Sequence, residues 1–194
     1  MNDLEFLADL YATCEACVDD DWPVLSHVGM LLAEHRPHLD LSLALDRACL
    51  EGDNYRLARQ LLDDSRVDPT SDESNCLVSA VALGRIKTVG CLLADGRADP
   101  NTGDGTCLDI AIENGYREIA RVLLADTRVD PSLDESKALL QAIHNSDTEL
   151  VVELLRYSSV RQAARWSDVI EYAVESENPT ILQVIRQASG LTDL

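Results

Sequence analysis

The 194-residue sequence predicts an all-α fold, a helical repeat solenoid of about six helix-turn-helix units with short projecting turns. Three observations carry this prediction. The chain is rich in Leu, Ala, Val and Ile, whereas aromatic residues make up only 4% of it, a composition that favours helices. Marker residues recur every 31 positions along the chain. Within one such interval, the spacing of apolar residues predicts two short helices.

The 31-residue period rests on three independent markers. Asp-Pro dipeptides, pairs of Leu and a single Ala all advance by the same step through the middle of the chain. The markers are Asp68-Pro69, Asp99-Pro100 and Asp130-Pro131; Leu61-Leu62, Leu92-Leu93, Leu123-Leu124 and Leu154-Leu155; and Ala80, Ala111, Ala142 and Ala173. A shared period of this length is the signature of a stacked repeat array.

Both ends of the chain follow the period less cleanly. Residues 28–33 are similar to residues 89–94, and residues 181–186 lie 31 positions after 150–155, although the Asp-Pro turn between those two segments is missing. Terminal repeats of a solenoid diverge because their outer faces meet solvent. We therefore expect a single repeat domain over 1–194, with divergent capping repeats at 1–40 and 161–194 and four core repeats at 41–160.

The unit around residue 110 shows how one repeat is built. Residues 106–115 are predicted to form a short helix that Gly115 ends by adopting the left-handed conformation. A second helix is expected at about 118–125, where Ile119, Val122 and Leu123 form an apolar stripe. Asp130-Pro131 then ends the helical pattern, because Pro lacks a backbone N–H and Asp favours turns. We expect a tight projecting turn at that point.

This unit resembles the ankyrin repeat. The stretch 99–116, DPNTGDGTCLDIAIENGY, matches that family's turn and its T-P-L-H-x-A-x-x-x-G-H pattern at Thr106, Leu108, Ala111 and Gly115, and departs from it at Cys107, Asp109 and Tyr116. The period is 31 residues, whereas the family usually has 33. The Arg-Val-Asp-Pro-Ser type of turn is also similar to arrays from large viruses and microbial eukaryotes.

The resemblance implies a protein-protein interaction module that binds a protein partner on its concave face, as a non-catalytic adaptor or effector. Carried across by register, the implied partner-binding residues lie on the turns and on the exposed side of each first helix. They are Asp72, Ser74, Thr102, Gly105, Glu113, Asn114, Asp134, Ser136, His144 and Asn145. The alternative for each of them is an ordinary solvated residue. The chain is expected to be a monomer.

The charge distribution narrows the class of partner. The formal net charge is -19, which argues against binding a nucleic acid or an anionic membrane surface. Residues 1–53 carry 12 acids and two bases, so the N-terminal end is the most acidic part. The surface therefore favours a partner with a basic surface, while the alternative is a solvated acidic end that aids solubility.

The N-terminal region suggests two alternatives to a plain capping repeat. Cys14 and Cys17 form C-x-x-C, and with the nearby His27, His35 and His38 they suggest a metal-binding or hydrolytic site. The repeat alignment favours a small core residue at Cys17 instead of a metal ligand, because Cys17 falls where Cys49 falls in the next repeat. The second alternative is a separate helix pair over the first 40 residues that docks an adaptor, as in repeat proteins that recruit ubiquitin ligases.

The sequence offers no other chemistry. His144 has no acid or nucleophile at a recognised spacing, and no G-x-x-x-x-G-K-[ST] loop accompanies Gly103 and Gly105. We therefore expect no cofactor and no enzymatic activity. Acidic residues interrupt the first apolar segment, which argues against a signal peptide there. No apolar run is long enough to span a bilayer. The expected location is the cytoplasm, or a host cell if the chain is a viral or effector protein.

Overall fold

A computed structural model describes residues 2–16, 22–34, 36–51, 53–70, 75–101 and 107–190. These residues form thirteen helices and contain no β-strand, which confirms the predicted all-α helical repeat fold. The chain divides into two compact units, Met1–Pro100 and Asn101–Leu194. Each unit is described by itself.

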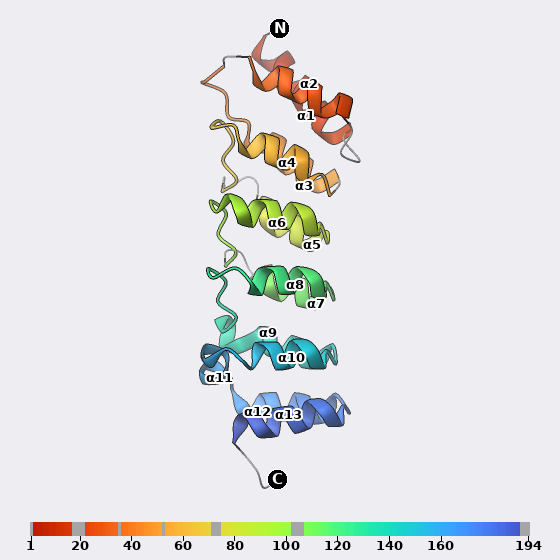
Figure 1. The fold of residues 1–194 in the computed structure, drawn as a ribbon, viewed down its shortest axis with the longest axis vertical. Coiled ribbons are helices and arrows are strands. Elements are labelled where there is room, and N and C mark those ends of the chain that lie inside the picture. The colour runs from red at the N-terminus through yellow and green to blue at the C-terminus, as the bar shows by residue number, and fades with distance from the viewer. Residues whose placement is uncertain are drawn as a thin grey trace. The chain divides into compact units, whose positions relative to one another are not determined.

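The first unit contains three helix pairs that follow one another in chain order (Figure 1). The first helices of the pairs pack against each other, as do the second helices, so the unit has two layers. Leu side chains at repeat-equivalent positions, such as Leu61 and Leu92, are fully buried between the layers. The helices are α1 (Asp3–Ala16), α2 (Trp22–Leu32), α3 (Ser42–Glu51), α4 (Tyr55–Leu62), α5 (Cys76–Ala82) and α6 (Ile86–Asp95).

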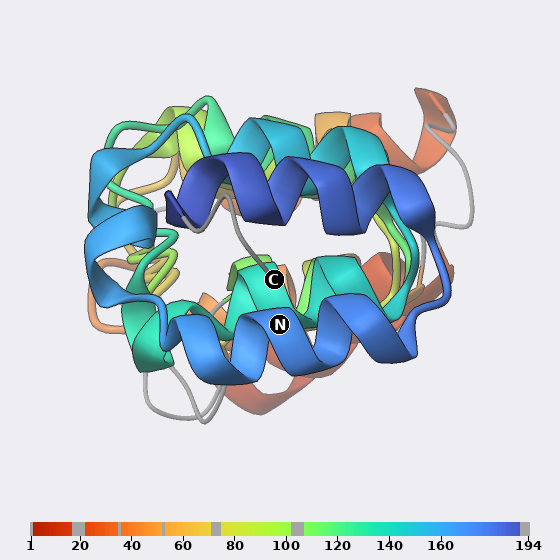
Figure 2. The same cartoon turned by 90° about the horizontal axis from the view of Figure 1, so that it is seen from below.

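The second unit also contains three helix pairs, with one additional short helix. Its first helices α7, α9 and α12 form one layer, and its second helices include α10 and α13, which contact each other. Figure 2 shows the last pair, α12 and α13, side by side. The helices are α7 (Cys107–Glu113), α8 (Arg117–Leu124), α9 (Leu133–His144), α10 (Thr148–Leu154), α11 (Ser158–Ala163), α12 (Trp166–Glu175) and α13 (Pro179–Ser189).

The turn between the two helices of a pair has the same backbone conformation in four repeats. Gly84 and Gly115 adopt φ of 72°, as predicted for Gly115, and Ser146 and Glu177 occupy the equivalent positions with φ of 54° and 52°. The left-handed conformation is strained for residues that carry a Cβ atom. The chain therefore keeps this turn even where the sequence offers no glycine.

The Asp-Pro segments form hydrogen-bonded turns. Asp130 Oδ1 accepts hydrogen bonds from the backbone N and the Oγ of Ser132, at 2.9 and 2.6 Å, and Asp68 Oδ1 does the same with Thr70. The Pro residues within these turns are buried. Consecutive turns are also joined, because Asn101 Oδ1 accepts from the backbone N of Asp130 at 3.0 Å. The turns thus stabilise the stacking of neighbouring repeats.

A second connection between repeats comes from an acid-x-Arg sequence that follows the second helices α2, α4, α6 and α8. Arg66 is held by Asp64 at 2.7 Å, and its Nη2 donates to the carbonyl oxygen of Leu32, at the end of α2. Arg97 is held by Asp95 and donates to the carbonyl oxygen of Leu62, at the end of α4. The last carbonyl groups of a helix have no partner within it, so these arginines satisfy groups that the preceding repeat leaves open.

One element departs from the predicted two-helix unit. α11 lies between the fifth and sixth helix pairs and packs against α9. In this region Tyr157 replaces the arginine of the earlier repeats, and its hydroxyl donates to the carbonyl oxygen of Leu124 at 3.0 Å. The carbonyl group at the equivalent helix end is therefore hydrogen-bonded by a tyrosine here instead of an arginine.

Candidate functional site

Nine of the ten predicted partner-binding residues fall into three groups, and Ser136 is described separately below. Glu113, Asn114, His144 and Asn145 are exposed at the C-terminal ends of α7 and α9, where each first helix turns into the second. Asp134 is exposed near the start of α9, at the other end of the same layer. Four further residues lie outside the described part of the chain: Asp72, Ser74, Thr102 and Gly105.

Three residues of the first group line a hollow of about 630 Å³ between the turns of two neighbouring repeats. Its walls are largely polar, with Glu113 and Asn114 from one turn and Asn145 from the next. Asn145 Nδ2 donates to the carbonyl oxygen of Ile112 at 2.6 Å, which fixes the two turns relative to each other. The hollow can accept polar side chains of a partner, and the Glu113 carboxylate adds a negative charge at its edge.

The expectation that Ser136 is exposed is wrong. Its side chain is fully buried, and its Oγ donates to the carbonyl oxygen of Val160 in α11 at 3.1 Å. Asp134, Glu135 and Ser136 all have positive φ, from 49° to 67°, which turns the chain inward at the start of α9. Register alone could not reveal this, because α11 has no counterpart in the other repeats. Ser136 is therefore a packing residue.

The second helices carry a ladder of ion pairs that sequence reasoning missed. Arg117 of α8 contacts Asp147 at 2.7 Å and Glu149 at 3.7 Å, and Arg121 contacts Glu149 at 2.8 Å and Glu153 at 3.9 Å. The signal was present in the sequence, since the two arginines are four residues apart and face two glutamates with the same spacing one repeat later. In this layer of the second unit, cations and carboxylates neutralise each other.

The N-terminal residues considered as metal ligands have other roles where the structure describes them. Cys14 is fully buried in the core. His27 pairs with Asp9 at 3.2 Å, and His38 pairs with Asp3 at 2.8 Å. Cys17 and His35 lie outside the described residues. Among the described residues, no group of three or more His, Cys, Asp or Glu side chains is arranged to hold a metal ion.

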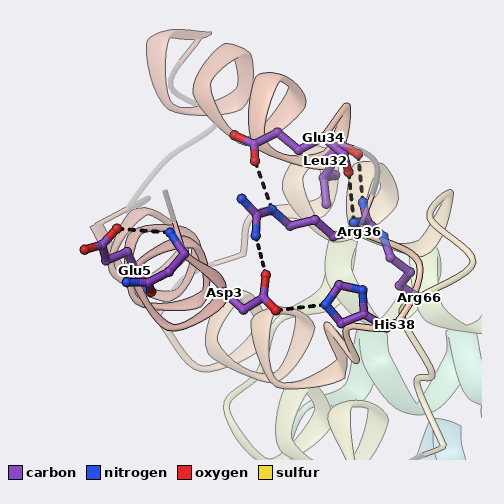
Figure 3. A network of polar contacts seen from close by, with 8 residues as sticks. Asp3, Glu5, Leu32, Glu34, Arg36, His38 and Arg66 are labelled. Carbon is purple, nitrogen blue, oxygen red and sulfur yellow. Dashed lines mark hydrogen bonds and ion pairs between the residues drawn. The ribbon is translucent and has the colours of Figure 1, made fainter.

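Figure 3 shows the network around Asp3. Arg36 donates to Asp3 and to Glu34, and its guanidinium lies 4.9 Å from the centre of the Phe6 ring. Hydrogen bonds from His38 and Arg36 lower the pKa of Asp3. Glu34 and Arg36 stand where Asp64 and Arg66 stand in the next repeat, so this network is the first-repeat form of the acid-x-Arg connection.

The buried cysteines of the first helices do not resemble reactive thiols. Cys49, Cys76 and Cys107 are buried on the first helices α3, α5 and α7. A hydrogen bond with Cys76, together with burial, raises the pKa of the Cys49 thiol well above its ordinary value. Reactive cysteines have lowered pKa values, so this pair is suited to packing.

In the described part of the chain, no helix combines the length and apolar character needed to span a membrane.

The repeat geometry agrees with a comparison to protein families. Residues 45–134 match the family model described as ankyrin repeats, in three copies. These residues are ankyrin repeats. No curated protein matches it.

Ankyrin repeats are generally protein-protein interaction modules, and members of the family are typically non-catalytic. The ankyrin-repeat segment covers α4 to α8 and most of α3. The hollow beside Glu113 begins inside the matched segment and extends beyond it to Leu150.

Proposed function

We propose that this ankyrin-repeat protein is a non-catalytic adaptor or effector that binds a protein partner through the first-helix face of residues 107–190. The observation that carries the proposal is the gathering of the exposed residues Glu113, Asn114, His144 and Asn145 at the ends of α7 and α9. All of them except His144 line the hollow of about 630 Å³. These side chains are exposed and polar, and the hydrogen bond from Asn145 to Ile112 joins the two turns that carry them.

The charges on this face favour a partner with basic side chains. Glu113, Glu171 and Glu175 are exposed on α7 and α12, whereas Lys137 is the basic residue of α9 on the same layer. Exposed apolar side chains at Tyr172 and Val174 lie among the carboxylates. A mixed surface of this kind fits a partner segment that combines Lys or Arg with aliphatic residues.

Charge reversal at the edge of the hollow tests the proposal. Partners are captured from the native cell on the intact chain and on Glu113→Lys, and the affinity of the captured protein is then measured at low and high salt. We expect Glu113→Lys to weaken binding about fivefold to tenfold at low salt, because one favourable contact becomes a repulsion.

A matched control changes the charge by the same amount elsewhere. Gln183→Lys combined with Gln187→Lys adds two positive charges to exposed positions of α13. This variant should retain the partner at full affinity. A partner that binds Glu113→Lys as tightly as the intact chain, at both salt concentrations, would contradict the proposed face and its electrostatic character.

A further inference from the structure

A second groove lies on the second-helix layer of the first unit, far from the ends of α7 and α9 in sequence. It has a volume of about 380 Å³ and runs between α4 and α6. Tyr55 and Arg59 of α4 and Lys87 of α6 line one part of it, and Cys91 of α6 is also among its lining residues. Two aspartates, Asp63 and Asp95, line the other part.

Arg59 lacks the carboxylates that contact its counterpart in a later repeat. Arg59 corresponds to Arg121 two repeats later, and Arg121 is bound by Glu149 and Glu153. The positions equivalent to those glutamates are occupied by Lys87 and Cys91 in the first unit. Within the described part of the chain, Arg59 forms no ion pair and neither does Lys87. The repeat thus keeps its cation and replaces both neutralising acids.

The surroundings increase the positive character of this end of the groove. The Lys87 ammonium lies 5.9 Å from the centre of the Tyr55 ring, and the Arg56 guanidinium lies 5.8 Å from it. Asp95 is already held by Arg97 at 2.8 Å, so among the lining acids Asp63 alone has no arginine within ion-pair distance. The lining as a whole contains two cations and two carboxylates, but the end formed by Tyr55, Arg59 and Lys87 is positive, in a molecule whose formal net charge is -19.

We infer that this groove is a second docking site and that its occupant is an acidic protein segment carrying aliphatic side chains. Carboxylates of the segment would take the positions that Glu149 and Glu153 take against Arg121 in the second unit. Its aliphatic side chains would contact Tyr55, Leu62 and Ala94, which form the apolar part of the walls. Two arguments favour this class of ligand: its charge is complementary to Arg59 and Lys87, and the second unit already contains arginine-glutamate contacts at the equivalent positions.

The test uses three labelled peptides and the full-length chain. One peptide alternates Glu and Leu, and the other two replace Glu by Gln or by Lys. Fluorescence anisotropy is expected to show binding of the Glu peptide at least about tenfold tighter than that of the Gln peptide, and no binding of the Lys peptide. A Gln or Lys peptide that binds as tightly as the Glu peptide, or a Glu peptide that does not bind, would overturn the inference.

Two further measurements locate the bound peptide. The double variant Arg59→Gln with Lys87→Gln should weaken the Glu peptide about tenfold, whereas Arg186→Gln, which removes an exposed arginine of α13, should leave its affinity unchanged. The Glu peptide should also slow the alkylation of Cys91 by iodoacetamide. Peptide mass mapping measures the rate of this alkylation. Unchanged affinity in the double variant, or an unchanged rate at Cys91, would exclude this groove. The outcome does not depend on the first-helix face.

Discussion

At the scale of single residues, the turn between paired helices keeps its left-handed backbone conformation even at residues that disfavour it. Ser146 and Glu177 hold the left-handed conformation that Gly84 and Gly115 hold in the preceding repeats. The Ser146 side chain is exposed, so replacing it with glycine removes strain and loses little contact. We expect Ser146→Gly to raise the free energy of unfolding by about 0.5 to 1 kcal/mol, measured by urea denaturation.

Two alanine substitutions isolate the backbone contribution. A Cβ atom at Gly115 or at Gly90 would meet no atom within 4 Å, but only Gly115 has positive φ. Gly115→Ala should therefore lower the free energy of unfolding by about 1 kcal/mol, whereas Gly90→Ala, inside α6, should raise it by about 0.5 to 1 kcal/mol. Changes of the same sign in both variants would disprove the conformational explanation.

At the scale of helices, the acid-x-Arg connection depends on the shape of the guanidinium group. Arg66 is largely buried and donates to Asp64 and to two carbonyl groups at the end of the preceding repeat, those of Leu32 and Glu34. Lysine has the same charge but cannot bridge these acceptors with a planar fork. We expect Arg66→Lys to lower the free energy of unfolding by about 1 to 2 kcal/mol.

Arg186→Lys provides the control for this prediction, because Arg186 is exposed on α13. It should leave the urea midpoint unchanged. Equal stability of Arg66→Lys and the original chain would mean that charge alone holds the two repeats together.

At the scale of the whole molecule, acid should weaken the connections between repeats. Hydrogen bonds from Arg66 lower the pKa of Asp64, and hydrogen bonds from Arg128 lower the pKa of Asp126. A carboxylate whose pKa is lower in the folded state stabilises the fold above the unfolded-state value, here 3.8, and this contribution disappears as the pH falls through the folded-state pKa.

The corresponding experiment compares the original chain with Asp64→Asn in urea denaturation between about pH 7 and about pH 2. The original chain should be the more stable of the two near neutral pH, and the difference should shrink only below about pH 4. A difference that stays constant across this range would show that Asp64 acts through packing rather than through its charge.

Much of this architecture could be predicted from the sequence, because the 31-residue markers are local and repeated. The helices expected at 106–115 and at about 118–125 are observed as α7 and α8. Long-range contacts were harder to predict. The burial of Ser136 depends on α11, a helix without a counterpart in other repeats. Asn145 is joined to the end of α7 by a hydrogen bond to the backbone carbonyl of Ile112, and such a contact has no sequence signal.

The arginine that joins one repeat to the next has a consequence for how such a chain can be rearranged. Arg66 and Arg97 each bring their own aspartate, and their acceptors in the preceding repeat are main-chain oxygens. Any sequence offers the same main-chain oxygens at a helix end, so this connection does not restrict which side chains its neighbour carries. A repeat of this type is therefore suited to duplication or exchange as a unit, provided that the segment moved is a whole number of 31-residue repeats.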